Sequence, residues 1–133
     1  MTTELYWLTL TVLMTALFWV PYVLDRPGVR GFGPWLLDTQ PETGTRHSLW
    51  AQRAIRAHQN AVENLAIMVP AVLTAHALNV SSPATRAAVI VYFFARLAHF
   101  LVYTAGIPLM RTVAFTVGWV AQLVVIASIL RWI

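Results

Sequence analysis

The chain contains no cysteine and no lysine. Without cysteine it has no disulfide frame, no thiolate metal site and no thiol nucleophile of its own, so any sulfur chemistry requires a bound ligand. All nine basic residues are arginines. This usage reflects either a bias in base composition or selection for guanidinium groups that bind anions.

Charged residues are scarce as well. They make up 11% of the chain, against about 25% in an ordinary soluble domain. Hydrophobic residues reach 59% and the mean hydropathy is +0.66. The composition excludes an ordinary soluble protein and predicts an integral membrane protein. With 133 residues, we expect one domain over residues 1–133, whose helices pack on one another or on other subunits.

Two uncharged apolar runs predict membrane-spanning helices. Residues 5–24 form a run of 20, enough to cross about 30 Å of hydrocarbon, and neither a basic region nor a small-x-small site marks it as a cleaved signal peptide. Residues 112–130 form the second run. The two segments between them resemble soluble core helices taken singly, but a short turn ending at Pro83 joins them as an antiparallel hairpin. We predict an all-α membrane bundle of four transmembrane helices at about 4–24, 48–78, 84–104 and 111–131.

The arginines are distributed unevenly across the predicted membrane. The segment 25–46, rich in proline, glycine and polar residues, is expected to be an extended loop. On its side of the membrane lie Arg26, Arg30, Arg46, Arg53 and Arg111, whereas near the other side lie only Arg86 and Arg131. The positive-inside rule places the first side in the cytoplasm and both termini outside, in what we expect to be a bacterial inner membrane.

A dense polar cluster precedes the apolar run 65–78. On a helix its members project within an arc of about 100°, while His58 points away. This polar cluster consists of Arg53, Arg56, Asn60, Glu63 and Asn64. Because the helix from about 48 to 77 is longer than the hydrocarbon is thick, the cluster lies at or beyond the interface. Ionisable groups at membrane depth pair or line a wet cavity, which predicts a functional pocket around Arg56 and Glu63.

The predicted third helix carries a second polar stripe. Its members are spaced by four, three and four residues, so they project within about 60° of one another. This polar stripe consists of Tyr92, Arg96, His99 and Tyr103. A strip of small residues beside it would let another helix approach closely; it consists of Ala84, Ala88 and Ala95. The hairpin brings the polar stripe to the depth of the polar cluster, with Arg111 beside them.

These polar residues have a structural alternative. Arg56 with Glu63, or Arg96 with a carbonyl or tyrosine, would then only hold the helices in register. Against this, the nearby arginines outnumber Glu63, the one nearby carboxylate within the predicted spans, and surplus buried positive charge favours an anion. A ligand with carboxylates and an amine would satisfy both signs. No set of histidines and carboxylates has the spacing of metal ligands, so we predict no metal site.

Three features together carry a resemblance to a known family. They are R-A-H-x-N-x-x-E-N at residues 56–64, R-x-x-H-x-x-x-Y at residues 96–103, and Pro108 with Arg111 before an apolar helix. In order and spacing they resemble the MAPEG family, the membrane-associated proteins in eicosanoid and glutathione metabolism, from about residue 53 to the C-terminus. The resemblance implies a four-helix protomer, a homotrimer, and glutathione bound as cosubstrate between neighbouring subunits at the cytoplasmic side.

The resemblance also implies a role for each matching residue. Those that hold or orient glutathione, or line its pocket, are Arg56, Asn60, Glu63, His99 and Tyr103, to which we add Arg53, Gln59 and Arg96 as candidate ligand-binding residues. Those with catalytic roles are Arg111, which would stabilise the thiolate, Thr112, a candidate hydroxyl donor to the sulfur, and Tyr103.

The chain departs from the family pattern at two positions. Gln59 stands where several members have a second arginine, which weakens the expected affinity for the glutathione carboxylates. Phe115 stands where some members have a tyrosine, which removes one candidate donor.

The sequence leaves three functional hypotheses. The first is a glutathione-dependent transferase or peroxidase that acts on lipophilic electrophiles entering from the bilayer. The second is a non-catalytic lipid-binding or scaffold protein of the same fold. The third, a small proton-coupled exporter using Glu63, is disfavoured because Arg56 and Asn60 would hold that carboxylate ionised. No nucleic-acid partner is expected.

The polar residues also predict self-association. They form more polar surface than one small protomer is expected to enclose, so we expect the second and third helices to face neighbouring subunits around a threefold axis. The residues expected in that interface are Arg56, Asn60, Glu63, Arg96 and His99.

Overall fold

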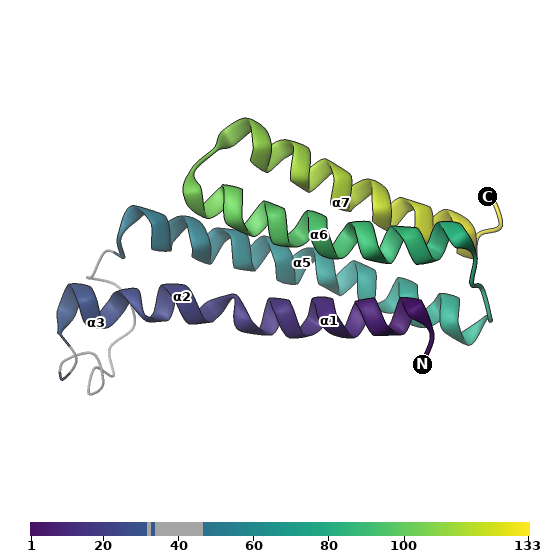
Figure 1. Ribbon diagram of the computed structural model, residues 1–133, viewed down its shortest axis with the longest axis horizontal. Helices are drawn as coiled ribbons and strands as arrows, with labels where there is room; N and C mark the ends of the chain where they lie inside the picture. The colour runs from purple at the N-terminus through teal and green to yellow at the C-terminus, as the bar shows by residue number, and fades with distance from the viewer. Residues whose placement is uncertain (32, 34–46) are drawn as a thin grey trace.

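The computed structural model describes residues 1–31, 33 and 47–133, and these residues are almost entirely helical (Figure 1). The helices form four antiparallel rods, of which the first is built from three consecutive pieces. In chain order the helices are α1 (Thr3–Leu17), α2 (Trp19–Val23), α3 (Asp25–Arg30), α5 (Leu49–Ala77), α6 (Pro83–Ala105) and α7 (Pro108–Ile129). The predicted all-α bundle of four helices is therefore confirmed.

Prolines divide the first rod. α1 ends at Leu17 and α2 ends at Val23, four residues before Pro21 and Pro27 respectively. A proline has no amide hydrogen for the carbonyl four residues earlier, and its ring clashes with that carbonyl. The helical path nevertheless continues to Arg30. The expectation of an extended loop from residue 25 is thus wrong for the six residues of α3, while the rest of that loop, apart from Gly31 and Gly33, lies outside the described residues.

Local signals fix the α5–α6 and α6–α7 turns. At the start of α6, Ser82 and Thr85 form a reciprocal capping box next to Pro83 in the first turn. The same helix ends at Gly106, whose φ of 80° lies in the left-handed region that favours glycine. α7 begins at Pro108, three residues before the predicted start, because a proline is well suited to the first helical position.

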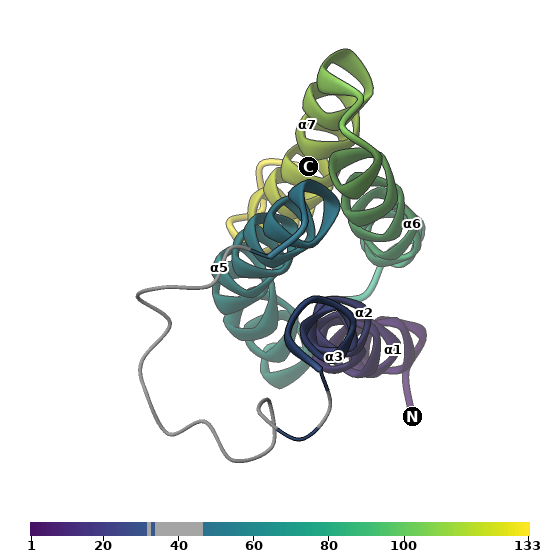
Figure 2. The ribbon, with the colours of Figure 1, turned by 90° about the vertical axis from the view of Figure 1, so that its left-hand side faces the viewer.

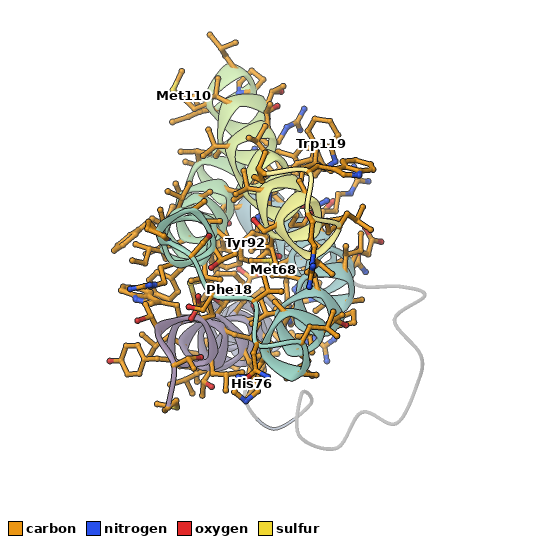
Figure 3. The ribbon with its side chains drawn as sticks, turned by 90° about the vertical axis from the view of Figure 1, so that its right-hand side faces the viewer. Phe18, Met68, His76, Tyr92, Met110 and Trp119 are labelled. Atoms are coloured by element: carbon orange, nitrogen blue, oxygen red, sulfur yellow. The ribbon has the colours of Figure 1, made fainter. Side chains whose placement is uncertain are left out.

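The four rods do not form a symmetric bundle. Seen end-on, α5 and α6 lie in the middle, with the α1–α3 rod on one side and α7 on the other (Figure 2). α7 packs against α6 and α5. Met68 and Tyr92 point into the bundle, whereas Met110 and Trp119 lie at its periphery (Figure 3). One side of α7 is consequently free to contact lipid or another subunit.

Among the residues that the structure describes, three segments are long and apolar enough to cross a membrane: Thr3–Gly28, Pro83–Ala105 and Pro108–Ile129. α5 is the longest helix, with 29 residues, or about 43 Å at 1.5 Å per residue. It runs alongside the other three rods (Figure 1), but its first half carries the polar cluster. α5 therefore brings charged side chains alongside three apolar helices, which makes it the element on which a functional site is expected.

A buried carboxylate ties the start of α1 to the start of α6. Glu4 is only 5% exposed, and its Oε1 accepts hydrogen bonds from the hydroxyls of Ser81 and Thr85, each at 2.8 Å. The position also suits a negative charge, because the amino end of a helix carries a partial positive charge. Sequence reasoning assigned Glu4 no role.

We expect Glu4→Gln to lower the free energy of unfolding by about 1–2 kcal/mol, since hydrogen bonds to a charged group are stronger than those between neutral groups. Thermal melting of the protein in detergent, followed by circular dichroism, measures the loss. Glu63→Gln is the matched control, because it removes an exposed carboxylate. Equal melting temperatures for the two variants would contradict a stabilising role for Glu4.

Candidate functional site

The turn between α6 and α7 gathers the catalytic candidates. Tyr103 lies in the last turn of α6 and Arg111 in the first turn of α7, and the left-handed Gly106 reverses the chain between them. The guanidinium carbon of Arg111 lies 4.8 Å from the centroid of the Tyr103 ring, a cation–π distance. The structure thus brings together two of the three residues to which the sequence assigned catalytic roles.

Arg53 approaches the same turn from α5. Its Nε donates a hydrogen bond to the backbone carbonyl of Thr104 at 3.0 Å, which is one of the carbonyls left open at the end of α6. A Cβ atom on Gly106 would lie 3.0 Å from the Arg53 guanidinium carbon. Glycine is therefore favoured here for two reasons, the positive φ and the close approach of Arg53.

A hollow of about 170 Å³ opens at this turn. Its walls contain two guanidinium groups and one phenol, and they come from the ends of three helices. The lining residues are Arg53, Tyr103, Gly106, Ile107, Pro108 and Arg111. Two guanidinium groups beside a phenol form a site suited to an anion, because each can donate charge-assisted hydrogen bonds.

Arg96 and His99 lie inside the protomer, with exposed fractions of 1% and 3%. Arg96 donates to the side-chain oxygen of Asn60 at 3.2 Å and to the carbonyl of Phe115 at 3.0 Å. The His99 ring lies 5.5 Å from the Tyr103 ring and 6.2 Å from the Phe115 ring, centroid to centroid. The expectation that Arg96 and His99 are buried by neighbouring subunits is therefore wrong, because both are buried within the protomer, where α7 of the same chain lies against both of them and α5 contacts Arg96.

Arg96 also contacts a carbonyl and a tyrosine, as the structural alternative predicts. Besides the Phe115 carbonyl, its guanidinium carbon lies 5.5 Å from the Tyr92 ring centroid. Its Nε and the Tyr92 hydroxyl are both buried without a hydrogen-bond partner among the described residues.

The remaining binding candidates face outward from α5. Arg56, Gln59 and Glu63 are exposed, and within the described part of the chain neither Arg56 nor Glu63 forms an ion pair or a side-chain hydrogen bond. The alternative of a buried Arg56–Glu63 pair within one chain is therefore wrong. Asn60 is half-buried between them, with its side-chain oxygen turned to Arg96.

Thr112 lies on the exposed face of α7. Its hydroxyl donates to the carbonyl of Pro108 at 3.3 Å, which is a common arrangement for a threonine inside a helix. The hydroxyl would have to leave this carbonyl to donate to a ligand sulfur. Its role as a donor stays a prediction.

Two residues of α7 that accommodate polar groups of α5 and α6 were not identified from the sequence. Gln122 is buried and donates to the carbonyl of Asn64 at 2.7 Å. Gly118 leaves the space that the Arg96 guanidinium occupies. The available signal was an amide and a glycine one turn apart within the apolar run 112–130, where neither residue type is expected without a packing reason.

The histidines on the opposite face of α5 take no part in this site. His58 bonds through Nδ1 to the hydroxyl of Tyr22 at 2.9 Å, which joins α5 to α2. His76 is exposed near the far end of α5 (Figure 3). Among the residues that the structure describes, no three histidine, aspartate or glutamate side chains are grouped to hold a metal ion.

Comparison with known proteins gives one family. The model of the MAPEG family matches residues 4–131 of the chain. No curated protein and no solved structure matches the chain.

Proposed function

Because this chain belongs to the MAPEG family, we propose that it is a glutathione-dependent transferase or peroxidase that acts on lipophilic electrophiles in the membrane. The observation that carries the proposal is the convergence of Arg53, Tyr103 and Arg111 on one hollow. Two guanidinium groups and a phenol suit the thiolate and carboxylates of glutathione. The family membership itself supports a membrane protein of the glutathione and eicosanoid metabolism family.

Arg111 would activate the thiol. A thiol with a pKa of about 8.5 is mostly protonated at neutral pH, and a nearby guanidinium lowers that pKa and so increases the reactive thiolate. In the transferase reaction the sulfur forms a bond to the electrophilic carbon, and the leaving group departs with the electrons of the broken bond. In the peroxidase reaction two thiols are oxidised to a disulfide while a hydroperoxide is reduced to an alcohol and water.

The outward face of α5 supplies the second part of the proposed site. Arg56 and Glu63 are seven residues apart, which separates them by about 10 Å along a helix. They are exposed and unpaired with each other, and a fully extended tripeptide reaches about 10 Å. Glutathione, a tripeptide with carboxylates at both ends and one amine, matches this spacing and both signs of charge.

The exposed position of these residues supports a site shared between subunits. Polar side chains facing lipid are costly, and we infer a homotrimer in which a neighbouring chain covers the polar face of α5. In a ring whose axis follows the membrane normal, all copies of Arg56 lie at one depth and all copies of Glu63 about 10 Å away. A ligand that spans this difference in depth would satisfy both residues at once.

The proposed orientation follows the distribution of arginines. The turn with Arg111 and the start of α5 face the cytoplasm, and both termini lie outside. We propose the bacterial inner membrane as the location. The surface that no neighbouring subunit covers would contact lipid.

A lipid-binding or scaffold protein is the second candidate. It is favoured by an apolar groove of about 450 Å³ between α6 and α7. Residues along the groove include Ala84, Ala88, Val91, Val117, Val120 and Val124.

Calorimetric titration of the purified protein with glutathione and oxidised glutathione, together with its mass in mild detergent, tests the proposal. We expect glutathione to bind to a trimer, because part of the site is exposed on each protomer. A monodisperse monomer that binds glutathione would contradict the shared site. A trimer that binds neither compound would favour the lipid-binding candidate.

A further inference from the structure

The buried side chain of Arg96 connects the two parts of the proposed glutathione site, and the role inferred for it rests on the proposed function. Arg96 projects from α6 and donates to Asn60 on α5 and to the Phe115 carbonyl on α7. Asn60 lies on α5 one turn from Arg56 and one turn from Glu63. Phe115 lies one turn after Arg111. One guanidinium therefore joins the ligand-facing surface of α5 to the first turns of α7.

Arg96 also determines which way the Asn60 amide faces. A guanidinium has only donors, so the atom of Asn60 turned toward it must be the oxygen. The amide nitrogen of Asn60, with two donors, then faces elsewhere. No residue in the described part of the chain accepts a hydrogen bond from it. Since Asn60 is half-buried between two exposed ligand candidates, its amide nitrogen remains available as a donor to a ligand on this face of α5.

α7 leaves space for the Arg96 guanidinium at Gly118. A Cβ atom on Gly118 would overlap Nη2 of Arg96 and lie 2.7 Å from its Nε. Gly118 is buried in the middle of α7, where glycine is a poor helix former. The rings of Tyr92 and Phe115 flank the guanidinium, at 5.5 and 5.3 Å from its carbon to their centroids. Its position is thus fixed on several sides.

The charge of Arg96 has no counter-ion among the residues that the structure describes. Within the described ranges it forms no ion pair, and its partners are a neutral amide, a backbone carbonyl and two rings. Apolar side chains would hold the helices together without the cost of burying a charge. Arg96 is better explained by the directional hydrogen bonds that it donates to the two ligand-bearing helices.

We propose that Arg96 is a positioning residue for glutathione. It turns the Asn60 amide so that its N–H groups face the ligand, and it holds α7 at the separation from α5 that brings Arg111 to the thiol sulfur. Arg96 itself does not touch the reacting atoms.

Gly118→Ala tests this inference because it displaces Arg96 without altering a residue at the ligand. A misplacement of about 1 Å costs on the order of 100-fold in rate. We expect kcat for conjugation to fall by about 10- to 100-fold, and the pH profile of kcat to move to higher pH because the thiolate is less stabilised. Gly28→Ala is the matched control, since its new Cβ meets nothing within 4 Å.

Two further variants separate positioning from folding. Asn60→Asp keeps an oxygen for Arg96 but removes the N–H donors, so glutathione affinity should fall about tenfold while the unliganded protein melts no lower than wild type. In an Arg96→Met background, Gly118→Ala should have no further effect on the pH profile, because the group it displaces is gone.

The outcomes are distinct. If Gly118→Ala keeps the wild-type kcat and pH profile, or only melts earlier, Arg96 is structural and the inference is wrong. If that variant does not fold, Arg96→Lys, which keeps the charge but not the forked geometry, takes its place with the same criteria. If wild-type protein binds no glutathione in the same titration, the proposed function fails, and this inference falls with it.

Discussion

Replacing Arg111 with alanine is expected to lower the rate of glutathione conjugation about 100- to 1000-fold, the range seen when one preorganised donor to a developing anion is removed. Glutathione binding should weaken much less, because Arg111 acts on the sulfur and the other candidate residues hold the peptide. The reason lies in the geometry of the turn, where the Arg111 guanidinium lies over the Tyr103 ring at the hollow. Steady-state kcat with a lipophilic electrophile and the ultraviolet absorbance of the bound thiolate measure the two effects.

Two other arginine variants complete this test. Arg111→Lys keeps a positive charge and should retain part of the thiolate absorbance, although it lacks the forked geometry of arginine. Arg86→Ala removes an exposed arginine from the first turn of α6, at the opposite end of that helix from Tyr103, and should leave the rate unchanged. If Arg111→Ala left both the rate and the absorbance unchanged, Arg111 would be only an interfacial charge.

The sequence predicted the helices, and the common level of Asn60 and Arg96 along the α5–α6 hairpin, because both follow from local periodicity. The polar stripe on α6 was recognisable from spacings that repeat on one helix face. The turn at Asn79 to Pro83 then required α5 and α6 to be antiparallel, which brought Asn60 to the level of Arg96, where the two now bond at 3.2 Å.

The sequence did not predict which neighbour would cover each polar face. A helical period gives the direction of a side chain relative to its own helix, but not which other helix lies in that direction. Arg96 and His99 were expected to face another subunit, whereas α7 returns over them within the same chain. The space left by Gly118 depends on the same contact, and an isolated glycine in an apolar run does not indicate which side chain fills it.

The division of the first rod was predictable in principle. Pro21 and Pro27 each lie four residues after the end of a helix, as the loss of the amide hydrogen requires. The proline- and glycine-rich composition of the segment after residue 24 favoured a loop. The structure shows that these prolines interrupt the helical path without ending it before Arg30.

Glu63→Gln is expected to weaken glutathione binding by about 10- to 100-fold, which corresponds to the loss of a charge-assisted hydrogen bond. The substitution keeps the shape of the side chain and removes its charge. Because Glu63 pairs with no described residue of its own chain, the unliganded protein should melt no lower than the wild type. Loss of a buried Arg56–Glu63 pair would instead have lowered the stability by about 3–5 kcal/mol. Titration calorimetry and thermal melting of the same preparation measure both quantities.

A substitution at Gln59 on the same helix is expected to change glutathione binding in the opposite direction. Gln59 is exposed on α5 beside Asn60, where several members of the family have an arginine. Gln59→Arg should therefore strengthen glutathione binding, since it adds a donor for a ligand carboxylate, and the gain should shrink at high salt. Normal affinity and normal melting in Glu63→Gln, together with no gain in Gln59→Arg, would show that the outward face of α5 does not bind the ligand. The opposite changes in the two variants are expected because the α5 face presents one group for the amine of glutathione and one for its carboxylate.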